Sequence, residues 1–172
     1  MQGLPTDTSG GVGGGDYFKP VLGQNKILIV GDAITGYEYW TGDDKPVRSK
    51  TKFTETPNAK VRQVKNPKTG EMESKTDTQK FFWAVPVYDF KDDTFKVWQI
   101  TQKAIKETLA SLQSNADWGN PVGAYTISID RKGEGLTTEY TVMANPSKDT
   151  EALSAIMARY AENTIDTESL FF

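Results

Sequence analysis

The chain has 172 residues, of which 37% are hydrophobic, and a formal net charge of −3. It contains no cysteine and no histidine, which excludes disulfides, thiolate metal sites and catalysis by a cysteine nucleophile or a histidine base. This length suits one domain. We therefore expect a protein that is not an enzyme and that has no catalytic residues, no cofactor and no bound metal.

No apolar run reaches the roughly 20 residues that span a bilayer. The first twenty residues also lack the basic start and the apolar segment of a signal peptide. We therefore expect a soluble, cytoplasmic protein that makes no membrane contact.

Positive charge is concentrated in one block of the sequence. Residues 45–80 contain ten Lys and Arg against four acidic residues, whereas residues 162–172 contain three acidic residues and no cation. The block is either an ordinary solvated loop surface or a groove that neutralises phosphates. Charge alone leaves both interpretations open.

The first part of the chain changes from a Gly-rich lead to a β pattern. Residues 1–15 are predicted to be a flexible N-terminus. A short apolar run, Ile27 to Val30, and alternation around Tyr37 and Tyr39 then predict strands, followed by a turn at "TGDDKP". Residues 57–80 contain little to bury and predict either a long mobile β-hairpin or a disordered loop.

The segment "FFWAVPVYDF", Phe81 to Phe90, is the most strongly β-like in the chain and pairs in the prediction with "TFKVWQI". Pro86 favours an edge or interrupted strand. Both faces of the segment are apolar or aromatic, so neither face simply meets water. One face carries Phe81, Trp83, Val85 and Val87, and the other carries Phe82, Ala84, Tyr88 and Phe90.

Helical periodicity predicts two helices. The first follows a cap at Thr101, with Ile105, Leu109 and Leu112 on its apolar face, and the second runs from an N-cap at Asp149 to Asn163. The second helix carries Leu153, Ile156, Met157 and Tyr160 on one face. Between the helices, Tyr125, Ile127 and Ile129 and then Leu136, Thr138, Tyr140 and Val142 predict two more alternating strands.

This order predicts a mainly β fold, a five- to six-stranded barrel resembling the OB-fold, with one internal helix and a C-terminal helix plus an acidic tail. The predicted divisions are the N-terminus 1–15, an OB-fold domain 16–146, and the helix and aromatic-ended tail 147–172.

Aromatic rings and cations together suggest a surface for single-stranded nucleic acid. Each ring alone is more often core, yet bases stack on such rings without sequence preference, and both faces of the segment from Phe81 to Phe90 are occupied. Alternation places Trp40 opposite Tyr37 and Tyr39, and we expect Trp40 to stack. The candidate nucleic-acid-binding residues are Tyr37, Tyr39, Trp40, Lys45, Arg48, Lys50, Lys52, Lys60, Arg62, Lys65, Trp83, Tyr88 and Trp98.

The acidic tail ends in apolar residues, which a purely solubilising tail would avoid. It would either occupy the protein's own cationic groove or dock into a partner. The candidate partner-binding residues are Asp166, Glu168, Leu170, Phe171 and Phe172. The acidic pairs Asp43-Asp44 and Asp92-Asp93 are interpreted as turn residues, because metal binding needs oxygens that converge from several positions.

Several phrases resemble the single-stranded DNA-binding proteins of tailed bacteriophages and prophages. They are "GYEYWTGDDKPVRSK", "FWAVPVYDF", "KVWQITQ", "DWGNPVGAYTISIDRKGEGL" and "TEYTV", within about residues 20–145. The resemblance implies an OB-fold protein that coats single-stranded DNA in phage replication and recombination without catalysis. It also implies residence in the host cytoplasm and tail partners among replication or recombination proteins.

The sequence therefore predicts a protein that binds and protects single-stranded DNA by base stacking and phosphate neutralisation. The alternative is a non-catalytic β-barrel module of a phage particle, which would use the basic block to contact another protein. An enzyme is the third and least favoured possibility. A nuclease, for example, would need converging acids and a divalent metal, and the acidic pairs are interpreted as turn residues instead.

Overall fold

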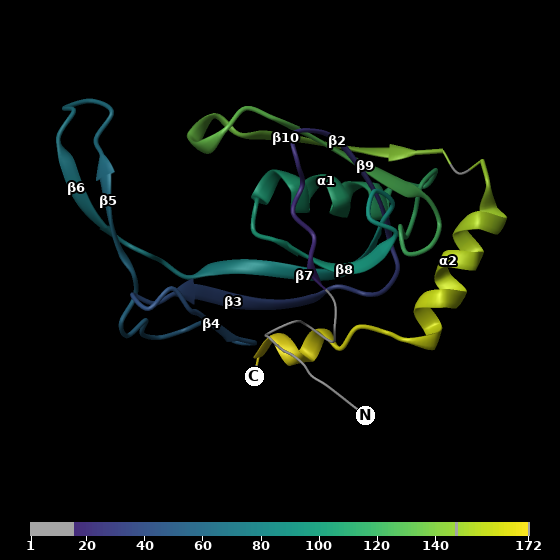
Figure 1. Ribbon diagram of the computed structural model, residues 1–172, viewed down its shortest axis with the longest axis horizontal. Coiled ribbons are helices and arrows are strands. Elements are labelled where there is room, and N and C mark those ends of the chain that lie inside the picture. Colours follow the sequence, from purple (N-terminus) through teal and green to yellow (C-terminus); the bar gives the residue numbers. More distant parts are fainter. Residues whose placement is uncertain (1–15, 147, 172) are drawn as a thin grey trace. The chain divides into compact units, whose positions relative to one another are not determined.

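The structure, a computed structural model, describes residues 16–146 and 148–171. The predicted flexible segment 1–15 and the terminal Phe172 lie outside the described residues. The described chain is mainly β, with ten strands and two α-helices (Figure 1). The strands are β1 (Asp16–Tyr17), β2 (Gly23–Ile29), β3 (Ile34–Trp40), β4 (Pro46–Ser49), β5 (Val61–Lys65), β6 (Met72–Thr76), β7 (Lys80–Asp89), β8 (Thr94–Ile100), β9 (Thr126–Lys132) and β10 (Glu139–Asn145). The helices are α1 (Lys103–Ser114) and α2 (Thr150–Glu162), with short 3-10 turns at Gly135–Thr137 and Thr167–Phe171.

The predicted mainly β class with an internal and a C-terminal helix is confirmed. The number of strands is higher than the five or six predicted, because β1 and β4 are short strands that the pattern did not predict, and β5 and β6 form in the segment that the sequence left open as a hairpin or a loop. Neither helix of the described chain is long and apolar enough to cross a membrane.

Contacts divide the chain into two compact units, described separately below. The larger unit comprises the described residues up to Ile34 together with Trp83–Ser169. The smaller unit comprises Thr35–Phe82 with Leu170 and Phe171. This division by contacts differs from the sequence boundaries at residues 16 and 146, which stay predictions.

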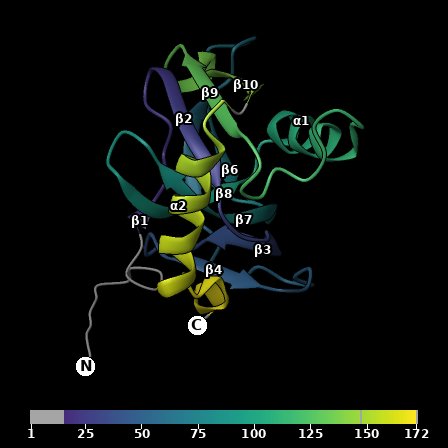
Figure 2. The same ribbon diagram turned by 90° about the vertical axis from the view of Figure 1, so that its right-hand side faces the viewer.

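In the larger unit the strand order is β1-β8-β7-β2-β9-β10. Neighbouring strands are antiparallel except β1 and β8, which are parallel. The two helices cover opposite faces of this sheet, as Figure 2 shows for β2 and β9. Ile105 and Leu109 of α1 pack in one buried cluster, while Leu153, Ile156 and Tyr160 of α2 pack in a second. The predicted apolar faces of both helices are thus confirmed.

Strand β7 supplies both clusters by the alternation of its side chains. Val85 and Val87 lie in the α1 cluster, and Tyr88 lies in the α2 cluster. The strand is interior, between β8 and β2, so of the two alternatives suggested by Pro86 the edge position is wrong, whereas the pairing with β2 is interrupted next to the proline. The sheet tolerates the proline because the register of β2 with β7 ends at Ile29–Val87, and the Pro86 carbonyl still accepts a bond from the Val30 N–H at 3.0 Å.

The helix starts were predicted with unequal success. Asp149 caps α2 as predicted, by accepting a hydrogen bond from the Ala152 N–H at 3.0 Å, whereas the helix ends at Glu162, one residue before the predicted end at Asn163. Helix α1 instead has Gln102 at its N-cap, without a side-chain capping bond, so the cap predicted at Thr101 is wrong. Residue type alone did not place that boundary.

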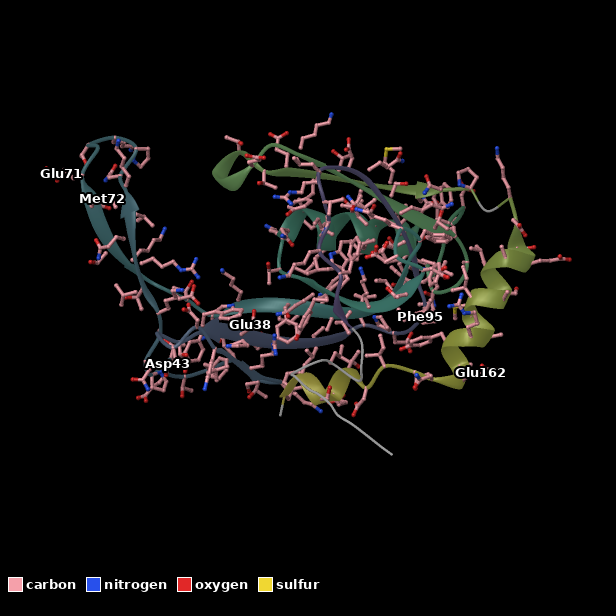
Figure 3. The ribbon with its side chains drawn as sticks, viewed as in Figure 1. Glu38, Asp43, Glu71, Met72, Phe95 and Glu162 are labelled. Atoms are coloured by element: carbon pink, nitrogen blue, oxygen red, sulfur yellow. The ribbon has the colours of Figure 1, made fainter. Side chains whose placement is uncertain are left out.

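Helix α2 is held to the turn after β7 by polar contacts as well as apolar packing. The hydroxyl of Tyr88 donates to the Asp93 carboxylate, and the Arg159 guanidinium reaches the same carboxylate at 3.3 Å. These hydrogen bonds hold the pKa of Asp93 below its ordinary value, while the bond to Asp93 and burial raise the pKa of Tyr88. Phe95, labelled in Figure 3, packs against Tyr160 with ring centroids 5.3 Å apart.

The burial of Trp98 generates a stability prediction. Its ring is 2% exposed and meets Phe18 edge-to-face at 5.8 Å. We expect Trp98→Ala to lower the free energy of unfolding by about 3–5 kcal/mol, because it removes a large buried ring. Urea unfolding followed by circular dichroism measures the loss. The control Met143→Ala, at a side chain 56% exposed, should change it by less than about 0.5 kcal/mol. A Trp98→Ala protein of unchanged stability and impaired DNA binding would contradict this assignment.

Candidate nucleic-acid interface

The smaller unit is built on the antiparallel pair β3–β4. Its register sets Glu38 opposite Arg48 and Trp40 opposite Pro46. The connecting turn is closed by bonds from the Thr41 N–H to the Lys45 carbonyl at 2.9 Å and from the Asp44 N–H to the Thr41 carbonyl at 3.0 Å. Asp44 adopts a left-handed φ of 58°, which short acidic and amide side chains tolerate. The predicted turn is confirmed.

Residues 57–80 form a hairpin, which is one of the two alternatives that the sequence left open. Strands β5 and β6 pair antiparallel, and all ten of their residues are exposed. Glu71 and Met72 lie at the tip of this ribbon (Figure 3). At its base, the Asp77 carboxylate accepts a bond from the Trp40 N–H at 2.8 Å. The base of the ribbon is therefore hydrogen-bonded to the end of β3, at Trp40, whose ring is predicted to stack on bases.

The predicted stacking rings separate into packed and accessible groups. Tyr39 is 3% exposed, donates its hydroxyl to the Pro57 carbonyl at 3.0 Å and packs edge-to-face on Phe53. Tyr37 and Trp40 are only half-buried. Phe81 was not among the predicted site residues, yet it is 39% exposed and its ring lies 5.3 Å from that of Tyr37.

The remaining predicted rings belong to the larger unit. Tyr88 and Trp98 are buried in its two clusters, and Trp83 is half-buried against the α1 cluster. A base cannot stack on Tyr39, Tyr88 or Trp98 while these rings stay packed. We correct their assignment on this ground and leave all three out of the interface.

The predicted cations also separate into two groups. Arg48 pairs with Glu38 at 2.9 Å, and both side chains are largely buried. Lys60 pairs with Asp44, and Arg62 lies 3.8 Å from Asp77. By contrast Lys45, Lys50, Lys52 and Lys65 are exposed, and within the described residues Lys45, Lys52 and Lys65 form no ion pair. Lys45, Lys52 and Lys65 can therefore meet a phosphate without first losing a carboxylate partner.

The C-terminal segment packs onto β3–β4. The ring of Phe171 stacks on that of Phe82 with centroids 6.1 Å apart and planes inclined by 26°, and the Lys50 ammonium lies 5.6 Å from its centroid. Arg48 donates to the Leu170 carbonyl at 3.5 Å. A Cβ at Gly36 would lie 2.8 Å from both rings, so only glycine leaves room for this stack. We call the place formed by Gly36, Lys50 and Phe82 the Phe171 site.

Of the other predicted tail residues, Leu170 contacts β4 through its carbonyl, which accepts the hydrogen bond from Arg48. Leu170 is buried, whereas Asp166 and Glu168 are exposed. Phe172 lies outside the described residues. Phe171 and the Leu170 carbonyl therefore both contact the rest of the smaller unit.

The acidic pairs lie in turns as predicted. Asp92 is 2.5 Å from the Lys96 ammonium, and Asp93 pairs with Arg159. Over the described ranges no three His, Cys, Asp or Glu side chains come together in a way that could hold a metal ion. The carboxylates of Asp44, Asp92 and Asp93 form local ion pairs.

Comparisons of the chain with family models, with curated proteins and with solved structures find no match. The likeness to phage single-stranded DNA-binding proteins thus stays a prediction made from the sequence phrases.

The ion pair with Glu38 predicts that Arg48 stabilises the fold, in contrast to the exposed lysines that could bind phosphate. We expect Arg48→Ala to destabilise the smaller unit by about 3–5 kcal/mol, because it leaves the Glu38 carboxylate buried without its ion-pair partner. Hydrogen exchange of the β3 and β4 amides, followed by NMR, measures this local loss. The matched control Lys52→Ala, at an exposed lysine, should leave exchange unchanged. Equal protection in both variants would make Arg48 a surface cation instead.

Proposed function

We propose that the chain binds single-stranded DNA, largely without regard to sequence, on the face of β3–β4 that carries Gly36, Arg48 and Trp40. The observation that carries the proposal is the Phe171 site. A flat ring lies there against Phe82, with the Lys50 ammonium over it. A nucleobase is also a flat ring that can stack on an aromatic side chain, and the phosphate attached to it is an anion that a lysine can bind.

The alternation of β3 extends this site into a row. Gly36, Glu38 and Trp40 are spaced by two residues and share one face of the strand. Arg48 lies opposite Glu38 on the same face, because directly paired residues of antiparallel strands point the same way. Trp40, half-buried at the far end of the row, offers a second stacking ring beside the exposed Lys45.

Electrostatics supports the same surface. The block 45–80 carries ten cations against four acids, and Lys45, Lys50, Lys52 and Lys65 are exposed. Each phosphate that these lysines neutralise releases condensed counterions, so affinity would fall steeply with salt. Arg62 and Lys60 would contribute after exchanging their carboxylate partners for phosphates.

The OB-fold-like barrel and the role in phage replication or recombination are part of this proposal. They are supported by the resemblance of the sequence phrases and by an antiparallel sheet with a helix inserted between β8 and β9. The alternative, a protein-interaction module, is favoured by the exposed apolar side chains of the β5–β6 ribbon, Val61 at 56% and Met72 at 61%.

Oligonucleotide binding tests the proposal. Short oligo-dT should bind at low ionic strength with quenching of tryptophan fluorescence, and log affinity should fall linearly with log salt. Trp40→Ala should weaken binding by about 1–3 kcal/mol without unfolding, and Trp40→Phe should recover part of the loss by restoring a ring. Absence of binding at low salt would remove the proposal in favour of the protein-interaction module. Loss of folding in Trp40→Ala would make Trp40 a core residue.

A second test concerns the tail. We expect deletion of residues 163–172 to tighten oligo-dT binding, because Phe171 would no longer compete for its stacking position on Phe82. Phe171→Ala should reproduce most of this gain, whereas Asp166→Asn with Glu168→Gln separates the effect of charge from that of the ring. Fluorescence titration at low salt measures all three, with circular dichroism as the folding control. Unchanged affinity after the deletion would leave partner recruitment as the tail's role.

A further inference from the structure

The larger unit contains a cavity of about 480 Å³ between its sheet and the start of α2. This volume lies within the usual range of small-molecule pockets. Strands β2, β9 and β10 supply one wall, and α2, which begins shortly after β10 ends (Figure 1), supplies another. The cavity lies wholly within the larger unit, so it is separate from the surface proposed above and does not rest on that proposal.

The wall formed by the sheet is polar, which is unusual so near two apolar clusters. Thr126 and Ser128 point to the same face of β9, because they are two residues apart. The register places Lys26 opposite Ser128 and Asn145 opposite Thr126. Polar side chains of three neighbouring strands therefore converge on one wall.

The hydrogen bonds on this wall leave the hydroxyl protons of Thr126 and Ser128 without an acceptor in the part of the chain that the structure describes. The Asn145 amide nitrogen donates to the Thr126 hydroxyl oxygen at 3.1 Å and to the Ser128 hydroxyl oxygen at 2.8 Å, and the Gln24 amide donates to Ser128 at 3.2 Å. Each hydroxyl thus acts as an acceptor, while its own proton has no acceptor among the described residues. Thr126 and Ser128 are only 7% and 5% exposed. Buried donors of this kind favour a ligand oxygen, because an unmade buried hydrogen bond is costly.

The other lining residues have a different chemistry. Phe90, Leu153 and Pro146 present apolar surface. The Lys26 ammonium lies 4.6 Å from the centroid of the Phe90 ring, and Lys148 stands exposed at the rim. The one carboxylate of the lining, that of Asp149, is engaged as the cap of α2. The cavity therefore combines an apolar wall, polar groups that can meet the edge of a heterocycle, and two cations.

We propose that this cavity binds one nucleotide, either free or as a unit of a strand. The base would lie along Phe90 and Leu153 with its polar edge toward Thr126, Ser128 and Asn145. A base carbonyl accepts the hydroxyl protons, and a ring N–H can donate to the Asn145 or Gln24 carbonyl oxygens. The phosphate would meet Lys26 and Lys148, in the manner of a small ligand held by a few placed polar groups.

NMR titration of the full ¹⁵N-labelled chain tests this assignment. Thymidine monophosphate, thymidine, inorganic phosphate and short oligo-dT are added in separate arms. We expect thymidine monophosphate to shift the side-chain amide signals of Gln24 and Asn145 in a saturable way. Thymidine and inorganic phosphate should each bind more weakly, because each makes only half of the contacts.

Variants distinguish recognition in the cavity from binding elsewhere. Ser128→Ala should weaken thymidine monophosphate roughly tenfold, the loss expected for one hydrogen bond. Lys148→Ala, at an exposed rim residue, should weaken it without disturbing the buried wall, so it remains informative if Ser128→Ala does not fold. Ser154→Ala, an exposed serine of α2 outside the lining, is the matched control and should bind as the unchanged chain does.

Each outcome decides the proposal. Shifts with thymidine monophosphate support a site for a free nucleotide, and shifts with oligo-dT alone support a site for one unit of a strand. Inorganic phosphate that reproduces the shifts at equal affinity overturns base recognition. Absence of shifts at Gln24 and Asn145 in every arm overturns the site, whether or not oligo-dT binds to the β3–β4 face.

Discussion

The larger unit depends on one constraint, the apolar character of both faces of β7. A strand that alternates between valines on one face and aromatic rings on the other cannot leave either face in water. The chain satisfies this constraint with two helices, α1 over the cluster that holds Val87 and α2 over the cluster that holds Tyr88. Fully burying a side chain of this size stabilises the fold by roughly 1.5–3 kcal/mol. The order of strands and helices along the chain follows from the need to cover both faces.

The same constraint determines which rings remain for binding. Tyr88 is buried on the face that α2 covers, and Trp98 is buried in the cluster on the other face. The larger unit therefore has few accessible aromatic rings on which a base could stack. The smaller unit has a thinner core, and Phe82 is buried there in contact with Phe171. Because the Phe82 ring is buried by contact with another ring, a nucleobase could take the place of Phe171 on it. This contact, more than the count of aromatics, locates the proposed interface.

Local signals in the sequence predicted local structure well. The cap at Asp149, the apolar faces of both helices and the two faces of β7 follow from spacing alone, because each depends on residues within a few positions. The ion pair of Arg48 with Glu38 and the packing of Tyr39 depend on strand pairing, so a count of cations and rings could not reveal them.

Contacts between distant parts of the chain were beyond the sequence argument. Phe82 and Phe171 are separated by most of the second half of the chain, and no periodicity links them. The polar wall of the cavity was also missed, because Thr126 and Ser128 alternate with isoleucines as solvent-facing residues of an ordinary strand do. Only the return of β10 with Asn145 and the position of α2 turn these hydroxyls into a buried pair.

Salt would act differently on the two occupants of the Phe171 site. Binding of a strand gains from phosphate neutralisation, which weakens as counterion concentration rises. The stack of Phe171 on Phe82 is a contact between uncharged rings, and burial of apolar surface does not depend on screening. Exposed Asp166 and Glu168 add a smaller, screened attraction to any nearby cation. If a strand and Phe171 compete as proposed, rising salt would shift the balance toward the tail because only strand binding weakens, whereas the salt-independent stack would lower the apparent DNA affinity by the same factor at every salt concentration. The slope of affinity against salt would therefore report the lysines rather than Phe171.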